Sequence, residues 1–258
     1  MMSPSAILQH ARTVTVRNNQ ENRFVNHSTV TPEQIEALRQ FDSPTISNAI
    51  EHFDVRDPVT GYTTNELVCH TPEITTPLVG FAVTAMGDTT LPGDTRPSRV
   101  GEVVELIEAS PAPRVLVVQH SGHDRRRACM FGDMFATILD KLGVTGIVSD
   151  MNARDRVGIR QRAPEFHLFT AGWVVSHGAP RYVDLNTVVT VCGLTVHPGD
   201  LLHGDESGLV SIPLNMVDDV IKQAQKVREH EAEYFDFLQS GRFNMEELKR
   251  RIKPEANK

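Results

Sequence analysis

Residues Gly132–Asp155, GDMFATILDKLGVTGIVSDMNARD, contain the pattern around which the rest of the chain is organised. The stretch begins with Gly-Asp at a predicted helix start, continues with apolar residues at helical spacing and a short buried strand, and ends with Arg154-Asp155. A strand that packs beside the helix preceding it runs back in the opposite direction. We therefore expect Asp133, Arg154 and Asp155 to lie at the same edge of a sheet.

Both ends of this stretch also have a purely structural explanation. Asp133 suits the first turn of any helix, and Arg154-Asp155 can be a surface ion pair that contributes little stability. The functional alternative uses the same groups. The amides of Met134 and Phe135 can bind a carboxylate, arginine recognises planar carboxylates, and aspartate suits a hard divalent cation. A position beyond a strand's carboxyl end favours a small oxo-acid site.

Composition limits the class of protein. The chain has 258 residues, of which 40% are hydrophobic and 23% charged, as in soluble globular proteins. Apolar runs such as Val115–Val118 are far shorter than the roughly 20 residues of a membrane span, and the N-terminus lacks a secretory pattern, so we expect a cytoplasmic protein without a membrane partner. A net charge of −7 argues against nucleic acid. Cys69, Cys129 and Cys192 are distant and odd in number, which indicates reduced thiols.

We expect the chain to divide into three parts: a flexible arm over 1–30, an α/β domain over 31–213 and a C-terminal helical extension over 214–258. Helix starts are predicted at Thr31-Pro32 and Ser43-Pro44. Further helices are predicted over 103–109, 132–142, 157–162, from 215 onward, and near 245–252. Strands are predicted over 80–86, 114–119, 146–149, 166–170, 188–191, 194–196, 201–202 and 209–212. Residues 203–208 are predicted as a tight loop.

Other polar clusters have weaker functional interpretations. His120, His123 and Asp124 include possible metal ligands, but a polar turn is the commoner explanation, and the same holds for His203 beside Asp205-Glu206. The loop over 87–93 is a candidate wall of an active site, although it lacks the Gly-Lys-Ser/Thr ending of a phosphate-binding loop. No Gly-x-Ser-x-Gly pattern supports nucleophilic catalysis.

The combination of Gly132-Asp133, twenty intervening residues and Arg154-Asp155 resembles the RraA-like family. That family includes 4-hydroxy-4-methyl-2-oxoglutarate aldolases and regulators of ribonuclease E activity. The resemblance covers roughly residues 31–213. Its other ordered landmarks are Ser43–Ala49, Gly80–Thr84 before Gly93-Asp94, Arg114–Gln119, Gly146–Asp150, and Pro198–Asp200 with Asp205–Val210.

The resemblance implies a fold and an assembly. The implied fold is an α/β/β/α sandwich like the swivelling phosphohistidine domain, here with an added C-terminal helical tail. The implied assembly is a homotrimer or homohexamer with active sites between subunits.

The resemblance also implies roles for individual residues. Asp155 would ligate Mg²⁺ or Mn²⁺, and Asp133 would hold the metal through water. Arg154 and the helix start at Gly132, Asp133, Met134 and Phe135 would bind the pyruvate unit of the substrate. A glutamate from a neighbouring subunit's C-terminal helix, for which we select Glu231, would complete the metal's surroundings.

The implied activity is that of a class II pyruvate aldolase. It would cleave a 4-hydroxy-2-oxo acid to pyruvate and a carbonyl compound, with oxaloacetate decarboxylase activity as a side reaction. The alternative from another class is a non-catalytic protein that binds and regulates a ribonuclease. A methyltransferase, a third label attached to the family, has no support from a Gly-rich nucleoside site in this sequence.

Overall fold

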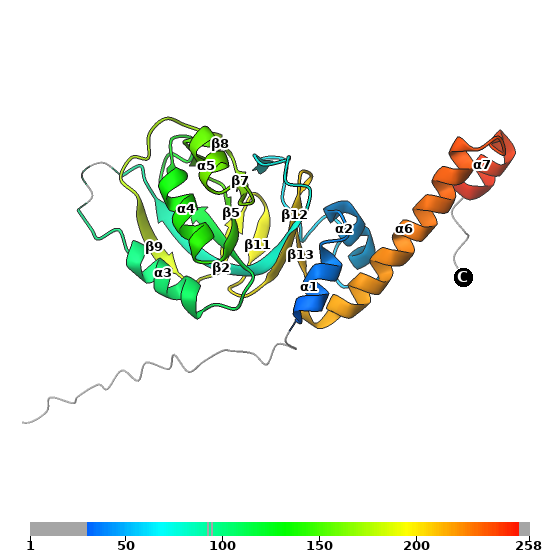
Figure 1. The fold of residues 1–258 in the computed structure, drawn as a ribbon, viewed down its shortest axis with the longest axis horizontal. Helices are drawn as coiled ribbons and strands as arrows, with labels where there is room; N and C mark the ends of the chain where they lie inside the picture. Colours follow the sequence, from blue (N-terminus) through cyan, green and yellow to red (C-terminus); the bar gives the residue numbers. More distant parts are fainter. Residues whose placement is uncertain (1–29, 92, 94, 253–258) are drawn as a thin grey trace, which may run out of the picture.

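The computed structural model describes residues 30–91, 93 and 95–252. Its main feature is an eight-stranded mixed sheet in the order β1-β7-β5-β3-β2-β12-β13, with β9 also paired to β2 (Figure 1). The central strands β2, β3, β5 and β7 are parallel, and antiparallel strands flank them. The bounds are β1 Val68–Cys69, β2 Leu78–Asp88, β3 Arg114–His120, β5 Val144–Ser149, β7 His167–Thr170, β9 Arg181–Leu185, β12 Leu201–Asp205 and β13 Gly208–Ile212.

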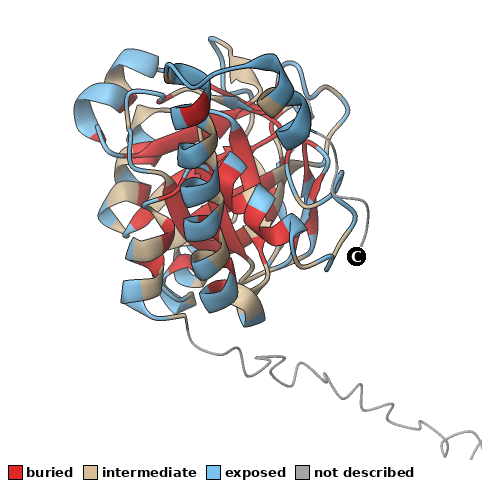
Figure 2. Ribbon diagram, turned by 90° about the vertical axis from the view of Figure 1, so that its right-hand side faces the viewer, coloured by how far each residue is buried: buried red, intermediate tan, exposed pale blue. Residues whose placement is uncertain are grey.

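The central strands form the core of the domain because they are apolar on both faces. Val115, Leu116, Val117 and Val118 of β3 are each 0% exposed, as expected of a parallel strand covered on both sides. Figure 2 shows buried residues concentrated on the strands and on the helix surfaces that face them.

Helices cover one face of the sheet at its parallel end. They are α3 (Val100–Ala109), α4 (Asp133–Lys141) and α5 (Arg156–Arg162), and they share a hydrophobic cluster with β3 and β5. A hairpin of β10 (Val189–Val191) and β11 (Leu194–Val196) packs on another part of the sheet. The α/β class with layers of sheet and helix, which the family resemblance implies, is therefore confirmed.

Three further helices pack around β12 and β13. They are α1 (Pro32–Leu38), α2 (Ser43–Glu51) and α6 (Val217–Gln239), which follows a short 3₁₀ turn, Leu214–Met216. The remainder of α6 projects away from the domain and carries α7 (Met245–Ile252) near its end (Figure 1). The predicted C-terminal helices are present. None of the helices within the described ranges combines the length and the apolarity that a membrane span requires.

The local signals for the first helix are confirmed in detail. Thr31 accepts a hydrogen bond from the amide of Gln34, and the Gln34 side chain accepts one from the Thr31 amide, which forms a capping box before Pro32. The second helix is capped by Asp42, one residue before the predicted Ser43. Apart from residue 30, the predicted flexible arm over 1–30 lies outside the described residues.

The prediction of a tight loop over 203–208 is wrong. Strand β12 continues through Asp205, and only a two-residue turn separates it from β13. His203 is 0% exposed. Its Nδ1 lies 2.9 Å from Ser43 Oγ, and its Nε2 lies 3.2 Å from the Leu38 carbonyl oxygen. These two partners permit a histidine inside a strand because both ring nitrogens are satisfied.

Candidate active site

A small parallel sheet, which the sequence did not predict, determines where the site lies. Its strands are β4 (Cys129–Phe131), β6 (Asn152–Ala153) and β8 (Gly172–Trp173). Phe131 is paired with Ala153, and the Arg154 amide donates to the Phe131 carbonyl at 2.9 Å. The residues that follow the two strands, Gly132 and Arg154, therefore leave the sheet side by side. This pairing brings the two ends of the stretch 132–155 together.

Gly132 provides the space in which Arg154 and Asp155 lie. A Cβ atom added at this glycine would lie 2.6 Å from Asp155 Oδ2 and 3.2 Å from Arg154 Nε. The backbone at Gly132 is extended, with φ −128°. A side chain is therefore excluded by the neighbouring groups rather than by backbone conformation.

Arg154 and Asp155 form a partly exposed pair. Arg154 Nε lies 3.3 Å from Asp155 Oδ2, and the two side chains are 34% and 36% exposed. Within the described part of the chain, the terminal nitrogens of Arg154 have no hydrogen-bond partner, so they are free to bind a ligand carboxylate with two parallel hydrogen bonds. Asp155 has a left-handed backbone, φ 62°, and sits immediately before α5.

Asp133 lies at the start of α4 and is held by α5. Its Oδ1 accepts from the Met134 amide at 2.8 Å, and its Oδ2 accepts from Arg162 Nη1 at 2.8 Å. Gly158 makes room for this pair, because a Cβ atom there would lie 2.4 Å from Asp133 Oδ2. Sequence reasoning missed Gly158 and Arg162. Their four-residue separation places both on one face of α5, and that spacing is the signal that could have identified them.

The two predicted amide donors at the start of α4, those of Met134 and Phe135, differ in whether they already make a hydrogen bond. The Met134 amide already donates to Asp133, and the Met134 side chain is 77% exposed. The first amide of the regular helical ladder is that of Ala136, which donates to the Gly132 carbonyl at 3.0 Å. The Phe135 amide precedes that ladder and is therefore one of the donors that a helix start leaves for a ligand. The Phe135 ring stacks on Phe131 at 6.5 Å and packs against the core.

The acidic groups suit a hard cation by their chemistry. Over the described ranges, no three His, Cys, Asp or Glu side chains gather closely enough to hold a metal ion. Mg²⁺ commonly keeps several waters and takes only one or two protein carboxylates. Asp155, which lies against Gly132, and Asp133, which lies against Gly158, match that donor chemistry.

Glu231 does not contribute to the site of its own chain. It belongs to α6, whose outer part projects away from α4 and α5 (Figure 1). A role for Glu231 in a neighbouring copy's site stays a prediction.

The histidines considered as metal ligands do not come together with the aspartate beside them. His120 ends β3, and its Nε2 lies 3.4 Å from Asp88 Oδ1. Asp124 instead lies 3.5 Å from Arg127. Burial alone would raise the pKa of Asp88, but hydrogen bonds from the Thr90 hydroxyl and amide lower it below its ordinary value. Asp88 is therefore held as a carboxylate by its own loop.

The cysteine nearest the site is not a nucleophile. Cys129 in β4 is 0% exposed, and burial raises the pKa of its thiol. A buried, protonated thiol is inert. All three cysteines are unpaired, and Cys129 and Cys192 are buried, in agreement with the expected reduced thiols.

Comparison with known families identifies the family to which this chain belongs. The sequence model of the RraA-like family, described as Aldolase/RraA, matches residues 43–211. The chain belongs to the RraA-like family. The resemblance inferred from Gly132-Asp133 and Arg154-Asp155 is confirmed.

Relatives within the family have two kinds of name. A protein of Halalkalibacterium halodurans named "Putative 4-hydroxy-4-methyl-2-oxoglutarate aldolase" is 32% identical over 123 residues, which cover 47% of this chain and 56% of that protein. The chain therefore spans little more than half the length of this relative. The solved structure of Streptomyces coelicolor RraAS2, described as an unusual member of the RNase ES inhibitor RraA family, has 21% identity. It aligns with a TM-score of 0.62 over 80% of this chain and 98% of its own.

A further solved structure has the same fold. An uncharacterized protein from Pseudomonas syringae pv. tomato aligns with a TM-score of 0.68 and 21% identity, over 87% of this chain and 96% of its own. At this level of identity the two structural matches establish the fold alone.

Proposed function

We propose that this RraA-like protein is a divalent-metal-dependent aldolase that cleaves a 4-hydroxy-2-oxo acid to pyruvate and a carbonyl compound, with oxaloacetate decarboxylation as a side reaction. The observation that carries the proposal is the meeting of Arg154, Asp155 and the start of α4 around Gly132. The name of the Halalkalibacterium halodurans relative supports the same chemistry.

The chain's own residues have distinct tasks in this proposal. The free end of Arg154 and the Phe135 amide bind the carboxylate of the pyruvate unit. When the bond between C3 and C4 breaks, the 4-hydroxyl group gives its proton to a water held by Asp133 and becomes a carbonyl. The electron pair stays on the pyruvate half, where the positive charge of Arg154 favours it. Asp133, oriented by Arg162, holds the water that returns a proton to that carbon.

A metal would be held by Asp155 directly and by Asp133 through water. When bound, Mg²⁺ or Mn²⁺ would polarise the 2-oxo group and stabilise the negative charge that develops there. Arg154 lies beside Asp155, so the guanidinium and the cation would act on the same end of the substrate.

Pyruvate release coupled to lactate dehydrogenase tests this proposal. With 4-hydroxy-4-methyl-2-oxoglutarate and with oxaloacetate, we expect Asp155→Asn and Arg154→Met each to lower the rate at least about 100-fold, as loss of a charge-stabilising group does. Chelation with EDTA should abolish turnover, and added Mg²⁺ or Mn²⁺ should restore it.

Arg160→Met is the matched control. Arg160 lies on helix α5, which follows Asp155, but it pairs with Glu73 at 2.7 Å, and its substitution should leave the rate unchanged. Full activity after chelation would contradict the metal requirement. Absence of turnover with every 4-hydroxy-2-oxo acid, together with capture of a ribonuclease by the Asp155→Asn variant, would instead support the regulator alternative.

The active unit is proposed to be a homotrimer or homohexamer. Apolar side chains on the projecting part of α6 and on the segment after it are exposed, namely Phe235, Leu238, Phe243 and Met245. An exposed apolar surface of this kind is typical of an interaction site. A second copy covering it would bring acidic residues of α6, including Glu231, to a subunit boundary.

A further inference from the structure

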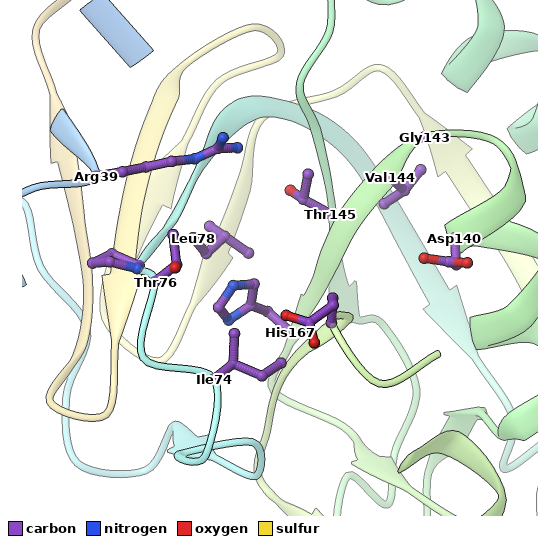
Figure 3. Close-up of a pocket in the computed structure, with 11 residues that line it drawn as sticks. Arg39, Ile74, Thr76, Leu78, Asp140, Gly143, Val144, Thr145 and His167 are labelled. Atoms are coloured by element: carbon purple, nitrogen blue, oxygen red, sulfur yellow. The ribbon is translucent and has the colours of Figure 1, made fainter. Parts of the chain in front are cut away.

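Figure 3 shows a cavity of about 340 Å³. It lies at the end of the sheet opposite the candidate active site. It is lined by the beginnings of β2, β5 and β7, at Leu78, Val144 and His167. Arg154 and Asp155, in contrast, follow the end of β5. The six residues of β5 separate the two places by roughly 20 Å, at about 3.3 Å per extended residue. The volume falls within the range of about 300–1,000 Å³ typical of small-molecule sites.

Half-buried Ile74 and Pro77 supply the accessible apolar part of the lining, beside almost fully buried Leu78 and Val144 and one unpartnered histidine. Leu78 is 1% exposed, Val144 2% and His167 7%. The His167 ring stacks on Phe169 at 6.1 Å and makes no hydrogen bond within the described part of the chain. Burial, followed by the nearby charge of Arg39, lowers the pKa of His167 to about 4. The floor therefore offers an apolar surface and a neutral ring that can exchange a hydrogen bond with a ligand.

The rim of the cavity carries opposite charges on opposite sides. In Figure 3 the guanidinium of Arg39 reaches in from the left, and Asp140 lies on the right beyond Thr145. Glu165 also lines the cavity. Asp140 belongs to the last turn of α4, whose carboxyl end is the negative pole of the helix. One side of the cavity therefore favours an anionic group and the other a cationic group.

We propose that this cavity binds an α-amino acid with an apolar side chain. The carboxylate would pair with Arg39, the ammonium group would face Asp140 and Glu165, and the side chain would lie on Ile74 and Pro77. The neutral His167 ring is available to either polar group. This site is separate from the proposed aldolase site and does not depend on it.

Calorimetric titration of the full chain with leucine and two analogues tests the charge pattern. Isopentylamine lacks the carboxylate, and 4-methylpentanoate lacks the ammonium group. We expect saturable binding of leucine and at least about tenfold weaker binding of each analogue, because each loses one charge-assisted contact. Glutamate and lysine should also bind more weakly, because a second charge would meet the apolar floor. No saturable heat with leucine, or equal affinity for the amine, would overturn the proposal.

Single substitutions then locate the binding to this cavity. Arg39→Met and Asp140→Asn should each weaken leucine binding at least about tenfold. The matched controls are Glu36→Gln and Lys141→Met, which remove the present ion-pair partners of Arg39 and Asp140 and should retain binding. Unchanged affinity in both Arg39→Met and Asp140→Asn would overturn the assignment. The titration measures binding without turnover. Failure of this binding proposal is therefore distinguishable from failure of the aldolase proposal.

Discussion

Gly132 and Gly101 offer a matched pair of substitutions. A methyl group at Gly132 would meet Asp155 Oδ2 at 2.6 Å, whereas one at Gly101, in α3, would meet nothing within 4 Å. We expect Gly132→Ala to displace Arg154 and Asp155 and to lower pyruvate release at least about tenfold, with little change in melting temperature because both side chains can move.

Gly101→Ala is the control for that substitution. It should keep full activity and gain about 0.5–1 kcal/mol of stability, because alanine loses less conformational freedom in a helix. Full activity of Gly132→Ala would show that the contacts around Gly132 do not position the catalytic groups.

His167 makes the stability of the fold depend on pH. Burial lowers its pKa to about 4 from the ordinary histidine value of 6.5, so the unfolded chain binds a proton more readily than the folded chain. The stabilisation is fully present above about pH 6.5 and is lost as the pH falls toward about 4. Between pH 7 and pH 5 we expect a loss of about 2 kcal/mol from this group.

Urea unfolding of the protein and of His167→Gln at both pH values measures that contribution. The variant should lose less stability between pH 7 and pH 5 than the unsubstituted chain does. Other buried histidines, such as His203, whose pKa burial also lowers, remain in both proteins and cancel in the comparison. An identical pH dependence in the two proteins would contradict the assignment to His167.

At the scale of elements, the long strands and helices were predictable but the small sheet was not. Strand β3 has a continuous apolar run and α4 an apolar face, and both patterns extend over several residues. Strands β4, β6 and β8 have only two or three residues each, too few to show a period. The pairing of Phe131 with Ala153, and hence the way the site assembles, is determined by tertiary packing.

The candidate site was predictable only in part for the same reason. The chemical types of Asp133, Arg154 and Asp155 and their spacing point to a common site. The contact between Asp133 and Arg162 joins two helices. The spacing of Gly158 and Arg162 indicates that they share a face of α5, but it does not indicate that Asp133 is their partner. His203 shows the converse error: a polar His-Gly-Asp-Glu sequence resembles a turn, but Ser43 and Leu38 satisfy the ring inside β12.

The hydrogen bond between Ser43 and His203 joins helix α2 to strand β12. Ser43→Ala would leave a ring nitrogen of His203 buried without a partner, at a cost of about 1–3 kcal/mol. We expect a corresponding decrease in the free energy of unfolding measured with urea. Ser47→Ala, on the same helix, removes only a long contact to Glu51 and should change stability by less than about 0.5 kcal/mol. Equal effects of the two substitutions would contradict a special role for Ser43.

At the scale of the whole molecule, the projecting α6 determines the last prediction. Phe235 is 55% exposed near the end of this helix, where water is an unfavourable environment for a large apolar ring. We propose that a second copy of the chain covers it in a trimer or hexamer. Phe235→Asp should therefore shift the mass measured by light scattering toward a smaller species. If Glu231 acts across the same boundary, pyruvate release should fall together with the mass.

Gln239→Asp is the control for that substitution, because it adds the same charge to an exposed polar position of the same helix. It should leave both the mass and the rate unchanged. Glu231→Gln separates assembly from catalysis: it should preserve the mass but lower the rate, and the loss should be accompanied by a weaker response to added Mg²⁺. A monomeric, fully active protein at assay concentration would contradict both the assembly and the role of Glu231, since one chain does not bring α6 to its own site.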